Sequence, residues 1–254
     1  MNHDTKTPAI RVRQLTMAYG DFVIQHDLSF DVAYGDIFIV MGASGCGKST
    51  LLKHLVGLNA PVAGEIFFNG VRFTPESSTD YDSILRSFGV LFQGGALWSS
   101  MTLAENIMLA MDQYTSFTPQ EKMERASFKL ALVGLAGYES YYPAQISGGM
   151  RKRAGLARAM ALDPQILFCD EPSAGLDPLS ARRIDDLILE LRESLGTTFV
   201  VVSHELASIF AIGSNAIFLG PVGQTAIAHG APATLRDTSQ DSRVREFLFR
   251  GEKS

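Results

Sequence analysis

The stretch "GASGCGKST" at residues 42–50 constrains the fold more than any other part of the chain. It follows the apolar run "IFIVM" and precedes "LLKHLVGL", so the pattern predicts a buried strand, a glycine-rich loop and a helix in direct succession. Glycines in such a loop let backbone N–H groups turn inward, and the helix N-terminus adds positive potential, so the loop is suited to bind phosphate. In loops of this pattern a lysine reaches the terminal phosphates and a serine hydroxyl ligates Mg²⁺. We therefore predict a nucleoside triphosphate site at Gly42, Ala43, Ser44, Gly45, Cys46, Gly47, Lys48, Ser49 and Thr50.

The rest of the chain alternates between strand and helix patterns around this loop. "QILFCD" and "TTFVVVSH" are apolar runs without alternation, which is typical of strands covered on both faces of a parallel sheet. The first third instead alternates at strand period, with Leu28, Phe30 and Val32 on one face, and Asn69-Gly70 predicts a hairpin turn. These patterns predict an α/β fold: a parallel-sheet core, an N-terminal antiparallel β subdomain and an inserted helical block.

The inserted block has its own helix signals. "TLAEN" and "TPQEK" each place a threonine three residues before a glutamate, which predicts capping boxes at Thr102/Glu105 and Thr118/Glu121. Helices are therefore expected to dominate from about 102 to 161, with breaks near Gly134 and Gly137.

Charge and composition exclude several classes of protein. The 254 residues have a formal net charge of −5, which gives no electrostatic footprint for nucleic acid. Only two cysteines are present, as expected for free thiols in a reducing compartment. The N-terminus lacks the apolar region of a secretory signal, and no run reaches the roughly 18 apolar residues of a membrane span. We therefore expect that any action at a membrane depends on partner chains.

Two further strand ends bear side chains suited to phosphate chemistry. "ILFCDEP" ends in Asp170, which suits Mg²⁺, and Glu171, which suits the deprotonation of an attacking water. His204 closes the strand "TTFVVVS", and the carboxyl ends of parallel strands gather at one edge, where it would reach the γ-phosphate. The alternatives are an acidic turn before Pro172 and a structural histidine.

A second glycine-rich helix start lies in "ISGGMRKRAGLARA". Ser147-Gly148-Gly149 precedes an Ala/Leu/Arg-rich helix, which predicts another anion-binding N-terminus. The phosphate loop at 42–50 would already surround the triphosphate of this chain. A second phosphate-binding element in the same chain is therefore explained if Ser147-Gly148-Gly149 binds the nucleotide of a neighbouring subunit. We interpret the basic run Arg151, Lys152 and Arg153 as a solvated helix face.

The phosphate loop, Gln93 in "LFQGG", "ISGGM", "ILFCDEP", "SAGLDP" and "VVSH" occur in the order and spacing of an ABC (ATP-binding cassette) ATPase, which the chain resembles over roughly residues 10–235. The resemblance implies a P-loop NTPase (RecA-like) core and a head-to-tail homodimer that closes around two ATP molecules. It implies that Tyr19 stacks on adenine, although a core tyrosine is the alternative. It implies that the catalytic residues are Glu171, His204 and Lys48, and that Mg²⁺ is bound by Ser49, Gln93 and Asp170. Residues implied to bind the ATP of the opposite subunit are Ser147, Gly148, Gly149, Met150 and Asp177.

The resemblance also suggests a division of the single domain 1–254. Residues 1–93 and 163–235 would form the nucleotide-binding core with the β subdomain, 94–162 the helical subdomain and 236–254 a C-terminal tail, with "DSRVREFL" as a tail helix or a frayed end.

"SGGMRKRAGLARA" and "FQGGALWSSMTLAENI" are similar to ATPases of Mce-type (Mla-like) transporters, which move phospholipids across the bacterial envelope. That similarity implies a permease partner, an Mce-domain lipid-binding protein, and a peripheral location at the cytoplasmic face of the inner membrane. Leu97, Trp98 and Met101 would suit the docking of the permease, and a local core role for these three residues is the alternative. The alternatives are an ABC ATPase for another cargo, such as a polar solute or lipoprotein, and a soluble ABC-type assembly or scaffold ATPase.

Overall fold

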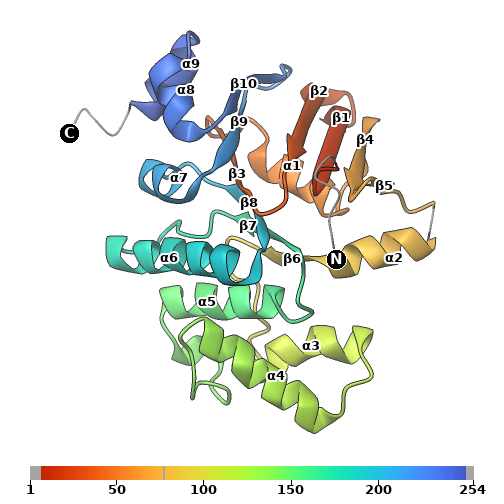
Figure 1. Ribbon diagram of the computed structural model, residues 1–254, viewed down its shortest axis with the longest axis vertical. Helices are drawn as coiled ribbons and strands as arrows, with labels where there is room; N and C mark the ends of the chain where they lie inside the picture. The colour runs from red at the N-terminus through yellow and green to blue at the C-terminus, as the bar shows by residue number, and fades with distance from the viewer. Residues whose placement is uncertain (1–6, 77, 250–254) are drawn as a thin grey trace.

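Two β-sheets form the frame of the molecule (Figure 1). The computed structural model describes residues 7–76 and 78–249. The larger sheet has six strands in the order β10-β9-β3-β8-β7-β6, all parallel except β10, which runs antiparallel to β9. Its strands are β3 (Ile37–Gly42), β6 (Phe88–Leu91), β7 (Ile166–Asp170), β8 (Thr198–Val202), β9 (Asn215–Leu219) and β10 (Ala226–Gly230).

The smaller sheet is antiparallel and N-terminal, as the alternating pattern predicts. Its order is β2-β1-β4-β5, with β1 (Ile10–Tyr19), β2 (Phe22–Val32), β4 (Ala63–Phe68) and β5 (Val71–Arg72). The predicted hairpin turn is confirmed, because Asn69 and Gly70 adopt φ of 52° and 81° between β4 and β5.

The predicted α/β fold with an inserted helical block is confirmed. The block lies between β6 and β7 and contains α3 (Leu103–Tyr114), α4 (Pro119–Leu132), a 3₁₀ turn at Pro143–Gln145 and α5 (Gly148–Ala159). Thr102 and Thr118 cap α3 and α4 through the predicted capping boxes. The remaining helices are α1 (Lys48–Leu55), α2 (Ser78–Ser87), α6 (Pro178–Leu195), α7 (Leu206–Ile212), α8 (Pro232–Thr238) and α9 (Ser242–Leu248).

Strand β3 separates two hydrophobic cores. Ile37, Ile39 and Met41 face the core shared with the helical block and α6, whereas Phe38 and Val40 face the core between the two sheets. Both faces of β3 are therefore buried, which explains its unbroken apolar sequence.

The tail segment "DSRVREFL" forms helix α9, and its stripe of Val244, Phe247 and Leu248 is buried against the first core. Phe247 packs edge-on against Phe218 of β9, with ring centroids 5.2 Å apart. The tail helix is thus an ordered part of the fold as far as residue 249.

Helix α5 lies directly on the backbone of β6. A Cβ built on Gly89 would come within 1.9 Å of the Ala159 carbonyl oxygen, and one on Gly155 within 3.0 Å of the Gly95 carbonyl oxygen. Only glycine permits this approach, which fixes α5 relative to the sheet.

The basic run of α5 is not the solvated face that its sequence suggests. Lys152 is buried, and Arg153 donates hydrogen bonds to the carbonyls of Val133 and Gly134 at the end of α4. Arg151 alone is exposed, and its guanidinium also donates to a main-chain carbonyl, that of Ile146. The prediction was wrong because long cationic side chains can donate hydrogen bonds to main-chain carbonyls at the ends of loops and helices. The spacing of residues along a helix gives no information about such carbonyls.

Among the described residues, no helix is both long and apolar enough to cross a membrane.

Candidate active site

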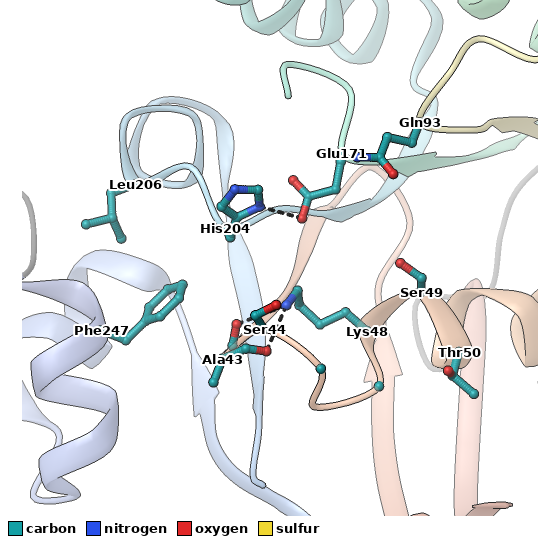
Figure 2. Close-up of a pocket in the computed structure, with 13 residues that line it drawn as sticks. Ala43, Ser44, Lys48, Ser49, Thr50, Gln93, Glu171, His204, Leu206 and Phe247 are labelled. Atoms are coloured by element: carbon teal, nitrogen blue, oxygen red, sulfur yellow. Dashed lines mark hydrogen bonds and ion pairs between the residues drawn. The ribbon is translucent and has the colours of Figure 1, made fainter. Parts of the chain in front are cut away.

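A pocket of about 520 Å³ lies beyond the carboxyl ends of the parallel strands. Figure 2 shows that Lys48 of the phosphate loop, Gln93, Glu171 and His204 surround the same space. The lining residues are Gly42, Ala43, Ser44, Gly45, Gly47, Lys48, Ser49, Thr50, Gln93, Glu171, His204, Leu206 and Phe247. The structure thus brings together the phosphate loop, Gln93, Glu171 and His204, as the order of the parallel strands leads us to expect.

The phosphate loop needs glycine where its backbone turns. Gly42 and Gly47 have φ of 148° and 104°, which side chains rarely adopt. A Cβ on Gly47 would also come within 2.5 Å of the Ile24 side chain. The loop is therefore pressed against strand β2 before it enters α1.

The Lys48 side chain folds back over the phosphate loop. The Lys48 side chain is buried, and its Nζ donates to the carbonyl oxygens of Gly42 and Ala43, each at 3.0 Å. This places the ammonium across the mouth of the loop, where a phosphate would supply stronger, charged acceptors than carbonyls.

The donor set beside Lys48 fits Mg²⁺. Ser49 Oγ donates to Asp170 Oδ1 at 3.1 Å, and Gln93 lines the same pocket. Mg²⁺ takes oxygen ligands, and it is commonly held by one or two carboxylates together with substrate phosphates. Among the described residues there is no group of three or more His, Cys, Asp or Glu suited to a metal.

The pKa of the Asp170 carboxyl is raised, although its surroundings act on it in opposite directions. Burial raises the pKa of its carboxyl, whereas the Ser49 hydroxyl and the charges of Lys53 and Lys48 lower that pKa. A bound cation would favour the carboxylate further, because opposite charge stabilises the ionised form.

Glu171 and His204 form a direct pair at the same edge of the sheet (Figure 2). His204 Nδ1 lies 2.7 Å from Glu171 Oε1, which accepts the hydrogen bond. The other carboxylate oxygen, Oε2, is buried and has no partner within the described residues. A buried acceptor without a donor is costly unless a ligand or water supplies one, so Oε2 is placed to take a hydrogen bond from a molecule in the pocket.

Tyr19 lies outside the lining of this pocket. It ends β1 with 52% of its surface exposed, and its hydroxyl accepts a hydrogen bond from Asn59 Nδ2 at 3.2 Å. The alternative of a core tyrosine is therefore excluded, and the aromatic face is free to stack on a planar ring.

The signature residues and Asp177 form a second surface, also outside the pocket of their own chain. Ser147 caps α5 by accepting from the Met150 N–H, and Asp177 caps α6 by accepting from the N–H groups of Leu179 and Ser180. A hydrogen bond from the Ser180 side chain, followed by that from the Ser180 N–H, holds the pKa of Asp177 below its ordinary value. The two helix starts are adjacent, since a Cβ on Gly149 would lie 3.3 Å from Ser180 Cβ.

Cys46 belongs to the loop, but its side chain does not line the pocket. The residue is 2% exposed and packs in the core between the sheets, and burial raises the pKa of its thiol. Cys169 on β7 is fully buried, with a pKa raised to about 12.

Three contributors to the pocket escaped the sequence analysis. Leu206 and Phe247 provide an apolar wall, and Gln25 holds the loop from behind. Gln25 is fully buried on β2, and its Nε2 donates to the carbonyls of Cys46 and Gly220, each at 2.8 Å. The Cys46 carbonyl and the Gly47 N–H belong to one trans peptide and point in opposite directions, so this bond aims the Gly47 N–H away from β2. The sequence signal that could have revealed Gln25 is a single amide side chain between the apolar residues of the β2 strand pattern.

Comparison with known proteins agrees with this geometry. The ABC transporter family profile matches residues 25–174. The chain belongs to the ABC transporter family. The match covers the phosphate loop, the signature and the acidic pair, which are the parts that an ATP-binding cassette needs for nucleotide binding and hydrolysis.

Individual ABC relatives match almost the whole chain. The intermembrane phospholipid transport system ATP-binding protein MlaF of Haemophilus influenzae is 39% identical over 94% of this chain and 89% of its own length. The probable ribonucleotide transport ATP-binding protein mkl of Mycobacterium leprae is 38% identical over 94% of this chain and 68% of its own length.

A solved dimeric ATP-binding cassette, bound to ADP and phosphate after hydrolysis, has a TM-score of 0.78 and 27% identity, covering 87% of this chain and 97% of that one. This ABC chain is therefore an ATP-binding ATPase subunit.

Proposed function

We propose that this chain is the motor subunit of an ABC transporter that moves phospholipid across a bacterial envelope. The observation that supports the cargo most directly is the 39% identity to an intermembrane phospholipid transport ATPase over 94% of the chain. Two copies would close head to tail on ATP, in line with the dimeric cassette of the same fold. The protein would lie peripherally at the cytoplasmic face of the inner membrane, held there by its partners.

We assign the following roles at each nucleotide. Lys48 and the loop N–H groups bind the β- and γ-phosphates, and Tyr19 stacks on adenine. Ser49, Asp170 and Gln93 would hold Mg²⁺, which neutralises phosphate charge when bound. Glu171 accepts the proton of the attacking water at its unpartnered Oε2, while His204 orients the carboxylate through Oε1 and reaches the γ-phosphate.

The signature completes the site across the dimer. Ser147, Gly148, Gly149, Met150 and Asp177 lie outside the pocket of their own chain, and the exposed start of α5 offers N–H groups with a positive dipole end. We therefore assign these residues to the nucleotide of the partner copy.

A groove between β6 and α3 provides a place for the permease. It encloses about 330 Å³ and is lined in part by Leu85, Phe88, Leu109 and Tyr114. Asn106, which also lines it, is fully buried and holds the adjoining loop: its side chain bonds both the N–H and the carbonyl of Trp98. Trp98 itself is 58% exposed, so its apolar side chain is available to a partner, while Asn106 holds its main chain.

A second cargo class is favoured by the mycobacterial relative, whose name specifies ribonucleotide transport. A mild-detergent pull-down from native membranes, with mass spectrometry of proteins and lipids, separates the candidates. A permease with an Mce-domain protein and bound phospholipid supports the lipid motor. A permease that co-purifies with a protein that binds polar solutes favours the polar cargo. The absence of any membrane partner contradicts both transport functions and favours a scaffold ATPase.

A further inference from the structure

Helix α5 connects the two surfaces of the active site through one buried cation. Its first turn carries the signature at the surface, and Lys152 follows one turn later with only 7% of its surface exposed. Lys152 Nζ donates to the carbonyl of Glu171 at 2.9 Å and to the carbonyl of Ala174 at 2.6 Å. Both acceptors belong to the loop that follows β7.

This loop holds Glu171 in an unusual backbone conformation. Glu171 has φ of 51°, in the left-handed region that residues other than glycine rarely occupy. Its N–H donates to the Val202 carbonyl at 2.9 Å, and its carbonyl accepts from the Ala174 N–H at 3.2 Å. Lys152 adds charged hydrogen bonds to the main chain of this turn, and charged hydrogen bonds are stronger than neutral ones.

A lysine at this position is difficult to explain by packing alone. Burial lowers the pKa of Lys152, and only the charges of Glu171 and Glu205 oppose that effect. An apolar side chain of the same length would fill the space without the desolvation cost of the ammonium. The two carbonyl contacts therefore give the reason for a cation here.

We propose that Lys152 is a positioning residue for ATP hydrolysis. Its ammonium fixes the turn from Glu171 to Ala174, so that the Glu171 carboxylate is directed at the water that attacks the γ-phosphate. Because Lys152 lies on the signature helix, it also joins α5 directly to the turn that carries Glu171. This inference rests on the proposed role of Glu171 as that base.

The test compares Lys152→Met, which keeps the length and removes the donor, with Lys152→Arg, which keeps donors. Lys129→Met is the matched control: Lys129 is 4% exposed in the same helical block, but its ammonium pairs with Asp163, away from the pocket. ATP affinity, kcat, KM and the thermal unfolding midpoint are measured for each variant in the full-length chain.

We expect Lys152→Met to lower kcat by about 10-fold to 10²-fold, the order of effect of a small misplacement of a catalytic group. ATP affinity and KM should stay within about threefold of the unmodified chain, and Lys152→Arg should recover part of kcat. The unfolding midpoint should fall no further than that of Lys129→Met. A kcat for Lys152→Met within twofold of the Lys129→Met value would overturn the proposal, as would a loss explained by unfolded protein.

A double-mutant cycle shows whether Lys152 acts through Glu171. In a Glu171→Gln background, Lys152→Met should lower the residual kcat no further, whereas a separate structural role would lower it by the same factor as before. The single variant Glu171→Gln distinguishes the two levels of inference. If Glu171→Gln retains normal kcat, the proposed base is wrong; if it is inactive while Lys152→Met is fully active, only the positioning role is wrong.

Discussion

At the scale of single residues, Glu171 adopts a left-handed backbone conformation, with φ of 51°, that glutamate rarely adopts. A left-handed conformation costs a residue of this type about 1–3 kcal/mol, so the surrounding structure must hold it there. The Val202 carbonyl, the Ala174 N–H and Lys152 do so. This local strain is thus carried by the residue that we propose as the base of ATP hydrolysis.

We expect Glu171→Gln to lower ATP turnover by about 10²-fold to 10⁴-fold, because the amide keeps the shape of the side chain but cannot accept the proton. ATP binding should persist and a closed dimer should accumulate, as seen by size-exclusion chromatography with ATP. Lys48→Ala provides the contrast, because removing the ammonium should weaken ATP binding itself. Near-normal turnover in Glu171→Gln would contradict the assignment of the base.

The structure and the sequence lead to opposite expectations for the alkylation of Cys46. Its position within the loop suggests that alkylation should block nucleotide entry and that ATP should protect the thiol. The thiol is instead buried against the core, with a raised pKa, so less thiolate is present at neutral pH. In a Cys169→Ser variant, maleimide labelling of the folded chain should be slow, faster above the raised pKa and little changed by ATP. Rapid labelling at pH 7 that ATP prevents would show that the thiol opens to the pocket.

At the scale of elements, local sequence signals decide where the helices of the inserted block begin. Thr118 and Glu121 exchange hydrogen bonds at the start of α4: the Glu121 N–H donates to Thr118 Oγ1, and the Thr118 N–H donates to Glu121 Oε2. These contacts hold the pKa of Glu121 below its ordinary value. The pair therefore stabilises the folded chain when the carboxylate is ionised.

We expect Thr118→Ala to reduce the free energy of unfolding by about 1 kcal/mol, the usual cost of losing such a cap. Chemical denaturation measures it, and Ser116→Ala, exposed two residues earlier, is the control. Because the pKa of Glu121 is lowered by folding, its contribution is present above its unfolded pKa of about 4.3 and is lost as the pH falls through the folded value. The difference between Thr118→Ala and the unmodified chain should therefore shrink in acid; an undiminished difference would show that Glu121 takes no part.

Elements with local signals could be predicted, whereas long-range polar contacts could not. The two capping boxes, the Asn69-Gly70 turn and the buried strands each depend on residues within a few positions of one another, so the sequence displays the whole interaction. Lys152 reaches a carbonyl 19 residues away, and Gln25 reaches one 195 residues away. Their acceptors are main-chain atoms, which leave no trace in residue type, so only the folded chain reveals them.

At the scale of the whole molecule, the nucleotide pocket and the groove between β6 and α3 are joined by Gln93. This residue lines the pocket and lies two positions after β6 (Phe88–Leu91), whose residues line the groove. A partner seated in the groove would therefore contact the segment that leads to Gln93, which we propose as a Mg²⁺ ligand. This connection is a short path by which nucleotide state can reach a permease.

We expect Trp98→Ala to weaken co-purification with the permease by about 30-fold or more, as for a buried aromatic anchor worth about 2 kcal/mol. Phe128→Ala is the matched control, because Phe128 on α4 has almost the same exposure, 59% against 58%. Quantitative pull-down at several protein concentrations provides the measurement, with circular dichroism to verify the fold. Equal retention of both variants would place the permease elsewhere.

The signature lies outside the pocket of its own chain, and its proposed action on the partner's nucleotide would set the kinetic order of the reaction. If each catalytic centre takes groups from two chains, hydrolysis per chain rises with protein concentration until every chain has a partner, and dilution alone acts as an inhibitor. A slow variant mixed with the normal chain would then reduce the rate by more than its share, since it enters pairs with active copies. The local abundance of the chain would in this way set the threshold at which ATP is consumed at all.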